Sequence, residues 1–313
     1  MTKKLIFLML LASQFTFAQQ NQIAKFFPVA AISPTASAAG YANVQTLVSG
    51  YIKPIGEDFG ALSNNGWYAT AENHKKWGFD LQVTMNTIFA KNDQKTFAVG
   101  SLTGINYGAT TSNSDPAPTA YGTEGEAPRF NYTSASNPNL IPAGVFLGPG
   151  GGNISKDIPI GSLVVPTITG GLGLFANTDI RFRYTPAVTL SDTELKNWGF
   201  GIQHDIKQHI PGLKMVPFSL SVLVAYSQLT ATTDLKGYYT DPTDPSSGNQ
   251  KGIGETKGYT AQVLVSKKVA VVTFYAGLGF NSSTTTYDIK GSYLVNSAYS
   301  AAGIKQHCLS QSP

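Results

Sequence analysis

Seven polar side chains stand at alternating positions in segments whose other residues are mostly apolar, and these are the residues that could do chemistry. They are Asp80, Gln82, Asn86, Arg181, Arg183, Gln203 and Gln262. Carboxylate, guanidinium and amide groups that line a water-filled lumen select solutes by charge and hydrogen bonding. Their types and spacing therefore predict solute selection. One alternative stays open, in which Arg181 and Arg183 pair with Asp80 inside a filled structure.

Other residue patterns do not point to catalysis, a cofactor or a metal. His204 and His209 are five residues apart with no third ligand nearby, which is typical of turn histidines rather than a zinc site. The glycine-rich stretch 148–152 lacks the Lys-Ser/Thr of a phosphate loop, and 171–176 matches a dinucleotide fingerprint by its letters alone. No pattern places a Ser nucleophile beside a His, so we expect no enzyme activity. The lone Cys308 excludes an intramolecular disulfide framework.

The elements that carry the polar residues are long strands. From Trp77 to Phe89 the odd positions are mainly large and apolar and the even ones small or polar, a two-residue period that a helix cannot sustain. At about 3.3 Å per residue, such a strand can cross a hydrocarbon layer at a tilt. Seven segments show the pattern: 77–89, 168–174, 180–185, 198–202, 218–226, 259–265 and 272–280.

The connections between these strands predict a membrane barrel rather than a soluble β-sandwich. Residues 176–179 and 266–269 are short turns, whereas about a dozen residues separate the third and fourth strands and 231–257 is a long polar loop. Short periplasmic turns that alternate with long outer loops are typical of membrane barrels. The fourth-to-fifth connection, 204–212, is predicted to hold a short interfacial helix with Ile206 and Ile210 on one face, ended by Pro211.

The first residues predict export. Lys3 and Lys4 precede an apolar run and then Thr16-Phe17-Ala18, so residues 1–18 have the parts of a secretory signal peptide. Only 13% of the residues are charged, and the formal net charge of +4 includes no basic stripe, so we expect no nucleic-acid partner.

Two further regions do not fit spanning strands. Residues 19–76 combine a low-complexity stretch at 28–39, a helical pattern at 44–55 and a turn at 64–68. Two interpretations stay open for this N-terminal segment: a luminal plug, or a disordered periplasmic tail followed by a helical cap. Residues 91–163 are rich in Gly, Pro, Ser, Thr and Asn, and strand parity makes them an extracellular loop, like 231–257.

Four stretches resemble a family of outer-membrane β-barrels common in Bacteroidetes. They are Tyr51–Gly56, Asn64–Tyr68, Gly78–Asp80 and Trp198–Gln208. The hairpins of that family are similar to those of the long-chain fatty-acid and aromatic-hydrocarbon transporters (FadL-like). The resemblance implies uptake of a small hydrophobic molecule through a plugged barrel. Its implied partners are outer-membrane lipid and the barrel-assembly machinery.

Together these observations predict an all-β fold, a transmembrane antiparallel β-barrel of at least eight strands, and ten to fourteen in a complete protein, over residues 77–300. The expected function is passive transport of small molecules across the cell outer membrane, with a hatch between Tyr41 and Tyr68 that controls passage. A non-conducting surface or adhesin-like barrel is the alternative, and a secreted soluble β-protein is a third interpretation.

The end of the chain is atypical for such a barrel. Seven strands are an odd number, the strand pattern stops after Phe280, and residues 301–313 lack the terminal aromatic residue of similar barrels. We therefore expect that a truncation or frameshift has removed the closing strand or strands.

Overall fold

The computed structural model describes residues 38–89, 91–99, 102, 105–107, 116–123, 128–132, 144–151, 162–190, 193–234 and 251–290. The predictions for the signal peptide at 1–18, the low-complexity residues before 38 and the tail at 301–313 lie outside these residues.

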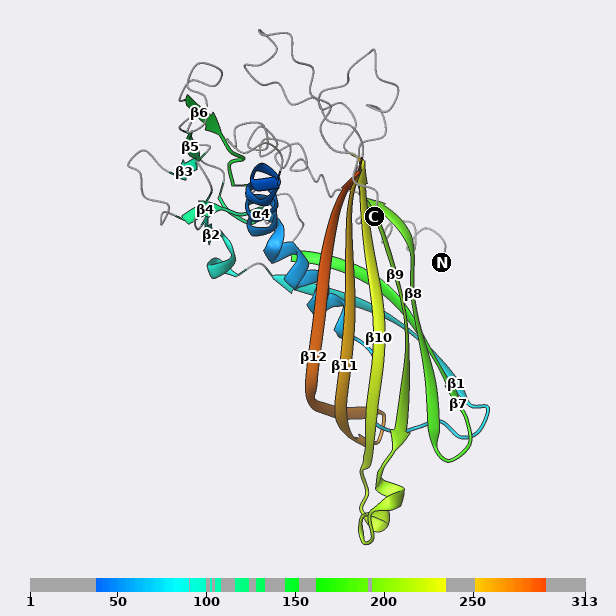
Figure 1. Cartoon of the computed structure of the whole chain (residues 1–313). Coiled ribbons are helices and arrows are strands. Elements are labelled where there is room, and N and C mark those ends of the chain that lie inside the picture. The colour runs from blue at the N-terminus through cyan, green and yellow to red at the C-terminus, as the bar shows by residue number, and fades with distance from the viewer. Residues whose placement is uncertain are drawn as a thin grey trace.

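The fold is all-β, and its main element is a seven-stranded antiparallel sheet that curls into a half-barrel (Figure 1). Each strand pairs with its neighbour in the order β1-β7-β8-β9-β10-β11-β12. The strands are β1 (Phe79–Phe89), β7 (Ser162–Gly173), β8 (Thr178–Leu190), β9 (Thr193–Asp205), β10 (Ser219–Asp234), β11 (Lys251–Val269) and β12 (Val272–Lys290). All seven predicted strands are therefore confirmed, in the predicted order.

Burial follows the alternation along the strands. The half-barrel has a concave inner face and a convex outer face. In β9, for example, the side chains of Asn197 and Gln203 are buried on the concave face, while those of Trp198, Phe200 and Ile202 are exposed on the convex face. A two-residue period sends neighbouring side chains to opposite faces, so one face of the sheet is polar and covered and the other is apolar and open.

The two turns predicted at 176–179 and 266–269 lie at one end of the half-barrel, but each is displaced along the chain, because residues 178–179 belong to β8 and residues 266–269 to β11. Residues 174–177 join β7 to β8, with Ala176 and Asn177 at positive φ, and residues 270–271 join β11 to β12. The β9–β10 connection holds two three-residue 3-10 helices, Lys207–His209 and Leu213–Met215. The predicted interfacial helix is thus a single 3-10 turn before Pro211, and a second one follows it.

The prediction of a long connection between the third and fourth strands was wrong. Strands β8 and β9 continue until Leu190 pairs with Thr193, so only residues 191–192 lie between them. A bulge between Thr185 and Val188 adds one residue to β8 and shifts the pairing. This shift breaks the alternation on which the prediction depended.

The segment between β1 and β7, predicted as a loop, contains short strands. Strands β2 (Thr96–Ala98) and β4 (Pro116–Pro118) pair, and β3 (Ile105–Tyr107), β5 (Arg129–Tyr132) and β6 (Gly144–Leu147) form a second small sheet. A 3-10 helix, Asn92–Gln94, precedes β2.

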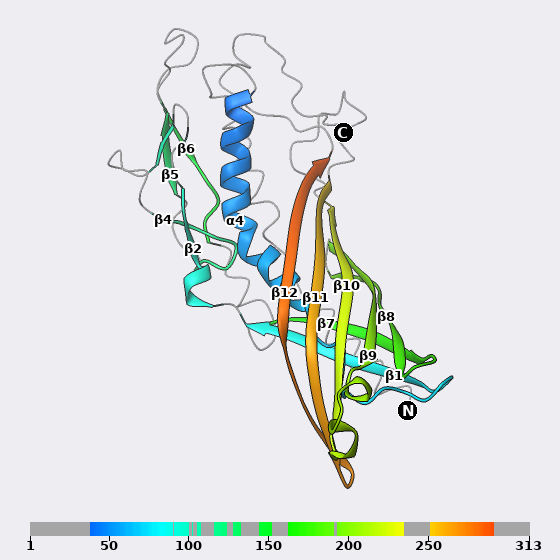
Figure 2. The same cartoon turned by 60° about the horizontal axis from the view of Figure 1, so that its bottom comes forward.

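Helix α4 (Ala38–Asn64) contacts β10, β11, β12 and β1 of the half-barrel as well as β2 (Figure 2). The sequence predicted a helix only at 44–55, and the helix continues through Pro54 to Asn64. Among the described residues, no helix combines the length and the hydropathy needed to cross a membrane.

Candidate functional site: the contact between the N-terminal segment and the concave face

All seven predicted polar residues belong to the concave-face positions of their strands. Arg181, Arg183 and Gln203 are fully buried, with exposed fractions of 2% or less. Asp80, Gln82, Asn86 and Gln262 are half-buried. The structure therefore brings together three residues at the centre of the sheet and leaves the other four toward its two edges.

Residues 63–75, which we call the inner segment, cover this face and begin with the last two residues of helix α4. Arg183 donates a hydrogen bond to the carbonyl of Ser63 at 2.6 Å and another to the carbonyl of Asn65. Its guanidinium also lies over the Trp67 ring, 4.1 Å from the ring centroid. The last carbonyls of a helix have no partner within the helix and carry partial negative charge, so a buried guanidinium stabilises this helix end.

Arg181 binds the same segment one step further along. Its Nη1 donates to the carbonyl of Trp67 at 3.3 Å, and its Nη2 lies 3.8 Å from Asp179 Oδ2. Arg181 thus has Asp179, a residue that the sequence analysis did not single out, as an ion-pair partner, and the predicted partner Asp80 also attracts it. The hydrogen bonds of both arginines go to backbone carbonyls of the inner segment, which favours the filled-structure interpretation over a free selective lining at these two positions.

Asp179 is fully buried and fixes the end of the inner segment. It accepts a hydrogen bond from the backbone N–H of His74 at 3.0 Å, and its Oδ2 lies 2.8 Å from His74 Nδ1. Gln203 pairs with Asp179 across the β8–β9 register and donates to the carbonyl of Thr70 at 3.3 Å. Asn73 in turn donates to the backbone carbonyl of Gln203 at 2.8 Å.

Two serine hydroxyls extend the contact to β10 and β11. Ser227 donates to the carbonyl of Ser63 at 2.6 Å, and Ser266 accepts from the backbone N–H of Ala71 at 2.9 Å. Side chains from four consecutive strands therefore hold the backbone of the inner segment. We call this set the clamp: Asp179, Arg181, Arg183, Gln203, Ser227 and Ser266.

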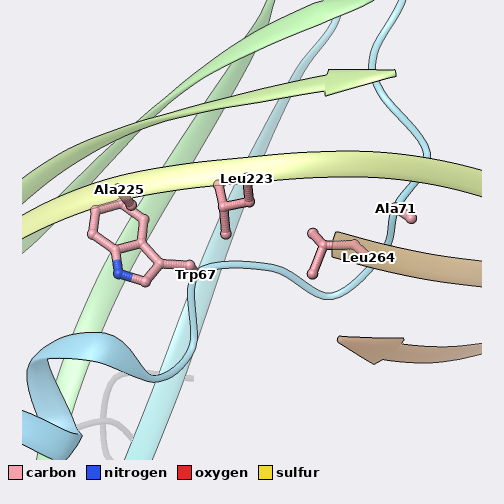
Figure 3. Packing of buried hydrophobic residues seen from close by; sticks show 5 residues of the cluster. All are labelled: Trp67, Ala71, Leu223, Ala225 and Leu264. Carbon is pink, nitrogen blue, oxygen red and sulfur yellow. The ribbon is translucent and has the colours of Figure 1, made fainter. Parts of the chain in front are cut away.

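An apolar cluster closes one side of the inner segment. Trp67 and Ala71 pack against Leu223 and Ala225 of β10 and Leu264 of β11 (Figure 3). Tyr68 adds an edge-to-face contact with Tyr275 of β12, with the ring centroids 5.8 Å apart. These contacts pack the middle of the inner segment against β10, β11 and β12.

Helix α4 reaches β12 through small residues. A Cβ atom at Gly60 would overlap the Ser283 side chain, so only glycine permits this approach. Thr285 donates to the carbonyl of Gly56 at 3.2 Å, and Tyr287 donates to the carbonyl of Ile52 at 3.3 Å.

The outer half of α4 is tied to the segment that follows β1. Tyr121 donates to Asp58 Oδ2 at 2.6 Å, and Gln94 donates to the other carboxylate oxygen at 3.5 Å. Burial raises the pKa of Asp58, and this effect outweighs the two hydrogen bonds, which lower it. Burial, together with the neighbouring Asp58, also raises the pKa of Tyr121.

The two histidines in and beside the β9–β10 connection contact each other. His204 Nε2 lies 3.0 Å from His209 Nε2, and Thr178 Oγ1 lies 2.8 Å from His204 Nδ1. Within the described part of the chain, no group of three or more His, Cys, Asp or Glu residues could hold a metal ion.

The sequence carried a signal for some of the clamp residues it missed. Asp179, Ser227 and Ser266 share the strand parity of the predicted polar residues, so the alternation could have identified them. The groups that accept hydrogen bonds from Arg181 and Arg183 are the backbone carbonyls of Ser63, Asn65 and Trp67. Every residue has such a carbonyl, so the residue type could not identify these acceptors.

The sequence model of a family of unknown function (DUF6588) matches residues 1–311, and the chain belongs to that family. Neither a curated protein nor a solved structure matches the chain.

Proposed function

We propose that this member of the DUF6588 family is an outer-membrane β-barrel whose wall includes the seven strands and which lets small molecules pass. The observation that carries the proposal is the convex face, where large apolar side chains lie exposed on every strand. Examples, with their exposed fractions, are Phe79 (78%), Ile168 (38%), Phe182 (60%), Phe200 (49%), Val224 (57%), Val263 (47%) and Leu278 (84%). An apolar surface of this extent is not stable in water, and lipid is the solvent that suits it.

The concave face supports the same proposal. It buries Arg181, Arg183, Asp179 and Gln203, whereas a soluble β-sandwich buries its apolar face. The strands are 11 to 19 residues long, and about 9 to 11 tilted residues suffice to cross the hydrocarbon layer. The polarity of the sheet is therefore inverted relative to a soluble protein, as a barrel wall requires.

The convex face also carries a row of aromatic side chains, near the middle of β9, β10 and β11. Tyr226 of β10 contacts Trp198 and Phe200 of β9 and Tyr259 of β11, at centroid distances of 5.6, 5.8 and 5.1 Å. This row adds large, mostly apolar side chains to the exposed convex surface.

Barrel closure is part of the proposal. Strands β1 and β12 are the edges of the described sheet, and lipid does not tolerate unpaired strand edges. Because seven antiparallel strands leave both edges running in the same direction, an antiparallel closure takes an odd number of additional strands. A barrel of at least eight strands satisfies this condition.

In the proposed mechanism, the clamp holds the N-terminal segment inside the barrel as a hatch. Solute collects at the outer end of the barrel, where β1 connects to β7 and β10 to β11, and passes beside the inner segment. A hatch is supported by hydrogen bonds between side chains of β8, β9, β10 and β11 and the backbone of one continuous stretch, residues 63–74.

Lipid contact is tested with the three tryptophans of the chain, Trp67, Trp77 and Trp198. The W67F/W77F variant keeps only Trp198, which is 46% exposed on the convex face, and W77F/W198F keeps only the buried Trp67. In vesicles that contain brominated lipid, we expect strong quenching of Trp198 and weak quenching of Trp67. Equal, weak quenching of both would contradict membrane insertion.

Passage is tested by liposome swelling with the full chain and with its Arg183→Ala variant. We expect solute entry with the parent protein and faster entry when the clamp is weakened. Vesicles that stay sealed with both proteins would instead support the non-conducting surface barrel.

A further inference from the structure

We propose that one end of the half-barrel binds the headgroups of anionic phospholipids. This end, which we call the turn end, carries residues 174–177, the β9–β10 connection and residues 270–271. The inference rests on the proposed function and adds the class of lipid that the barrel recognises and the residues that recognise it. The observation that carries it is a difference in charge between the two ends of the sheet.

Contacts between the connections place them at the same end of the molecule (Figure 1). The backbone N–H of Asp205, at the end of β9, donates to the carbonyl of Asn177 in the β7–β8 turn at 3.0 Å. The backbone N–H of Trp77, just before β1, donates to the carbonyl of Gly173, the last residue of β7, at 2.8 Å. The first residue of β10 pairs with Ser266, near the end of β11. The start of β1 therefore lies at the turn end together with the three connections.

Five lysines of the turn end are exposed. They stand just before β1, in the β9–β10 connection and at the end of β11: Lys75, Lys76, Lys214, Lys267 and Lys268. Within the described ranges, none of the five forms an ion pair with an aspartate or a glutamate. Lys207 differs, because its ammonium donates to the carbonyls of Val216 and Phe218, both at 2.6 Å, and so holds the β9–β10 connection together.

The carboxylates at this end do not neutralise the five lysines. Asp179 is buried in the clamp, and Asp205 accepts hydrogen bonds from the backbone N–H groups of Lys207 and Gln208. In the part of the chain that the structure describes, Glu72 is the one exposed carboxylate of the turn end. The turn end therefore has an excess of positive charge.

Lysines toward the other end of the sheet are paired instead. Lys196 of β9 lies 2.5 Å from Glu194, and Lys257 of β11 lies 2.9 Å from Glu255, in each case between the ammonium nitrogen and a carboxylate oxygen. Such pairs leave little net charge at their positions. The excess of unpaired ammonium groups thus belongs to one end of the strands.

Large apolar side chains lie exposed beside the five lysines. Trp77 follows Lys76, whose ammonium is 5.9 Å from the centroid of the Trp77 ring. Met215 follows Lys214, and Val271 stands in the turn between β11 and β12. At a membrane surface, the apolar side chain enters the acyl layer while the lysine extends to the headgroups. Each of the three lysine groups therefore has the two parts that an interfacial contact requires.

The three groups are spread over the whole width of the sheet. Strand β1 forms one edge, β11 and β12 lie at the other, and β9 and β10 lie between them. A protein partner would bind one contiguous patch, whereas a lipid leaflet surrounds the entire rim of a barrel. Several lysines close to a membrane surface attract anionic lipid. The distribution of the lysines therefore favours phospholipid headgroups as the partner.

The test measures which lipid surrounds Trp77 in the full chain. The W67F/W198F variant keeps Trp77 alone and is folded into vesicles that mix phosphatidylcholine with phosphatidylglycerol, one of the two lipids being brominated. We expect brominated phosphatidylglycerol to quench Trp77 several-fold more strongly than brominated phosphatidylcholine at the same mole fraction. Because salt screens the attraction between exposed charges, about 1 M NaCl should remove this preference.

Substitution of the lysines identifies the cause of the preference. In the same background, K75Q/K76Q/K214Q/K267Q/K268Q should quench equally with both lipids. The matched control, K53Q/K91Q/K196Q/K251Q/K257Q, removes the same charge from exposed lysines away from the turn end and should keep the preference. Heat-modifiable mobility verifies that both variants are folded.

The outcomes separate this inference from the proposed function. Equal quenching by the two lipids before any lysine is changed, or a preference that survives the loss of the five lysines, would overturn the inference and leave membrane insertion standing. A preference lost equally in the control would assign it to net charge rather than to the turn end, and would also overturn the inference. Absence of quenching by either lipid would overturn membrane insertion itself.

Discussion

At the scale of single residues, the charged groups of the concave face mainly hold the chain's own backbone. Arg183 donates to the carbonyls of Ser63 and Asn65, and Arg181 to that of Trp67. Strand parity was enough to place both arginines on the concave face. Their partners could not be predicted, because a backbone carbonyl looks the same at every position in a sequence.

Replacing Arg183 by lysine should loosen the inner segment. An ammonium is a point donor and cannot reproduce the planar fork that reaches two carbonyls at once. We expect the opening free energy of residues 63–75 to fall by about 1.5–3 kcal/mol, the range for a buried hydrogen bond to a charged group. Hydrogen exchange of the backbone amides of residues 63–75 measures this opening free energy.

The control for this prediction is Lys196→Ala. Lys196 pairs with Glu194, and both side chains are at least 40% exposed. Exposed ion pairs contribute little, so exchange in the inner segment should not change. Equal protection in R183K and the parent would refute the clamp.

Asp58 makes the attachment of α4 dependent on pH. Its raised pKa means that the folded state binds a proton more tightly than the unfolded state does. Protonated Asp58 therefore stabilises the folded state, fully so below the ordinary aspartate pKa of about 3.9. This stabilisation is lost as the pH rises through the raised pKa of Asp58 in the folded protein. Asp58→Asn should remove this dependence of stability on pH. Asp93→Asn, which changes an exposed residue of the 3-10 helix before β2, should leave the dependence unchanged. Protease protection of α4, measured from pH 3 to 8, distinguishes the two.

At the scale of elements, periodicity predicted every long strand but not all of their ends. The bulge at Thr185–Val188 interrupts the alternation in β8, so the last part of that strand and the start of β9 were assigned to a loop. Strands β2 to β6 have only three or four residues each, too few for a period to appear. Helix α4 extends beyond its predicted range because contacts with the sheet stabilise it, whereas its glycines and Pro54 weaken the local signal.

The close approach of α4 to β12 depends on Gly60, and it predicts that substitutions at Gly60 and Ser283 affect each other. Gly60→Ala would stabilise an isolated helix by up to about 1 kcal/mol, but here the new methyl group meets Ser283. We expect a net loss of stability in G60A and its recovery in G60A/S283G, measured as a double-mutant cycle by urea unfolding. Additive effects of the two changes would show that the helix and the strand are not in contact at this point.

At the scale of the whole molecule, the faces of the sheet are inverted relative to a soluble protein. The interior contains arginine, aspartate and glutamine around a short apolar cluster, and the outside carries phenylalanine, leucine and valine. The sequence predicted which residues share a face, because parity is a local property. It could not predict how the inner segment crosses the sheet, because that arrangement depends on contacts between residues more than 100 positions apart.

If the convex face contacts lipid, as we propose, charge placed on it should have an effect that a soluble protein would not show. Val224 is 57% exposed near the middle of the convex face, and Met215 is 93% exposed in the β9–β10 connection. In water, replacing either by arginine should change stability by no more than about 0.5 kcal/mol, as most surface substitutions do. In lipid, arginine near the bilayer midplane costs about 2–4 kcal/mol, while the same change close to the interface costs little. We therefore expect V224R, and not M215R, to make folding into vesicles less favourable by that amount. Equal stabilities would mean that the convex face contacts something other than lipid.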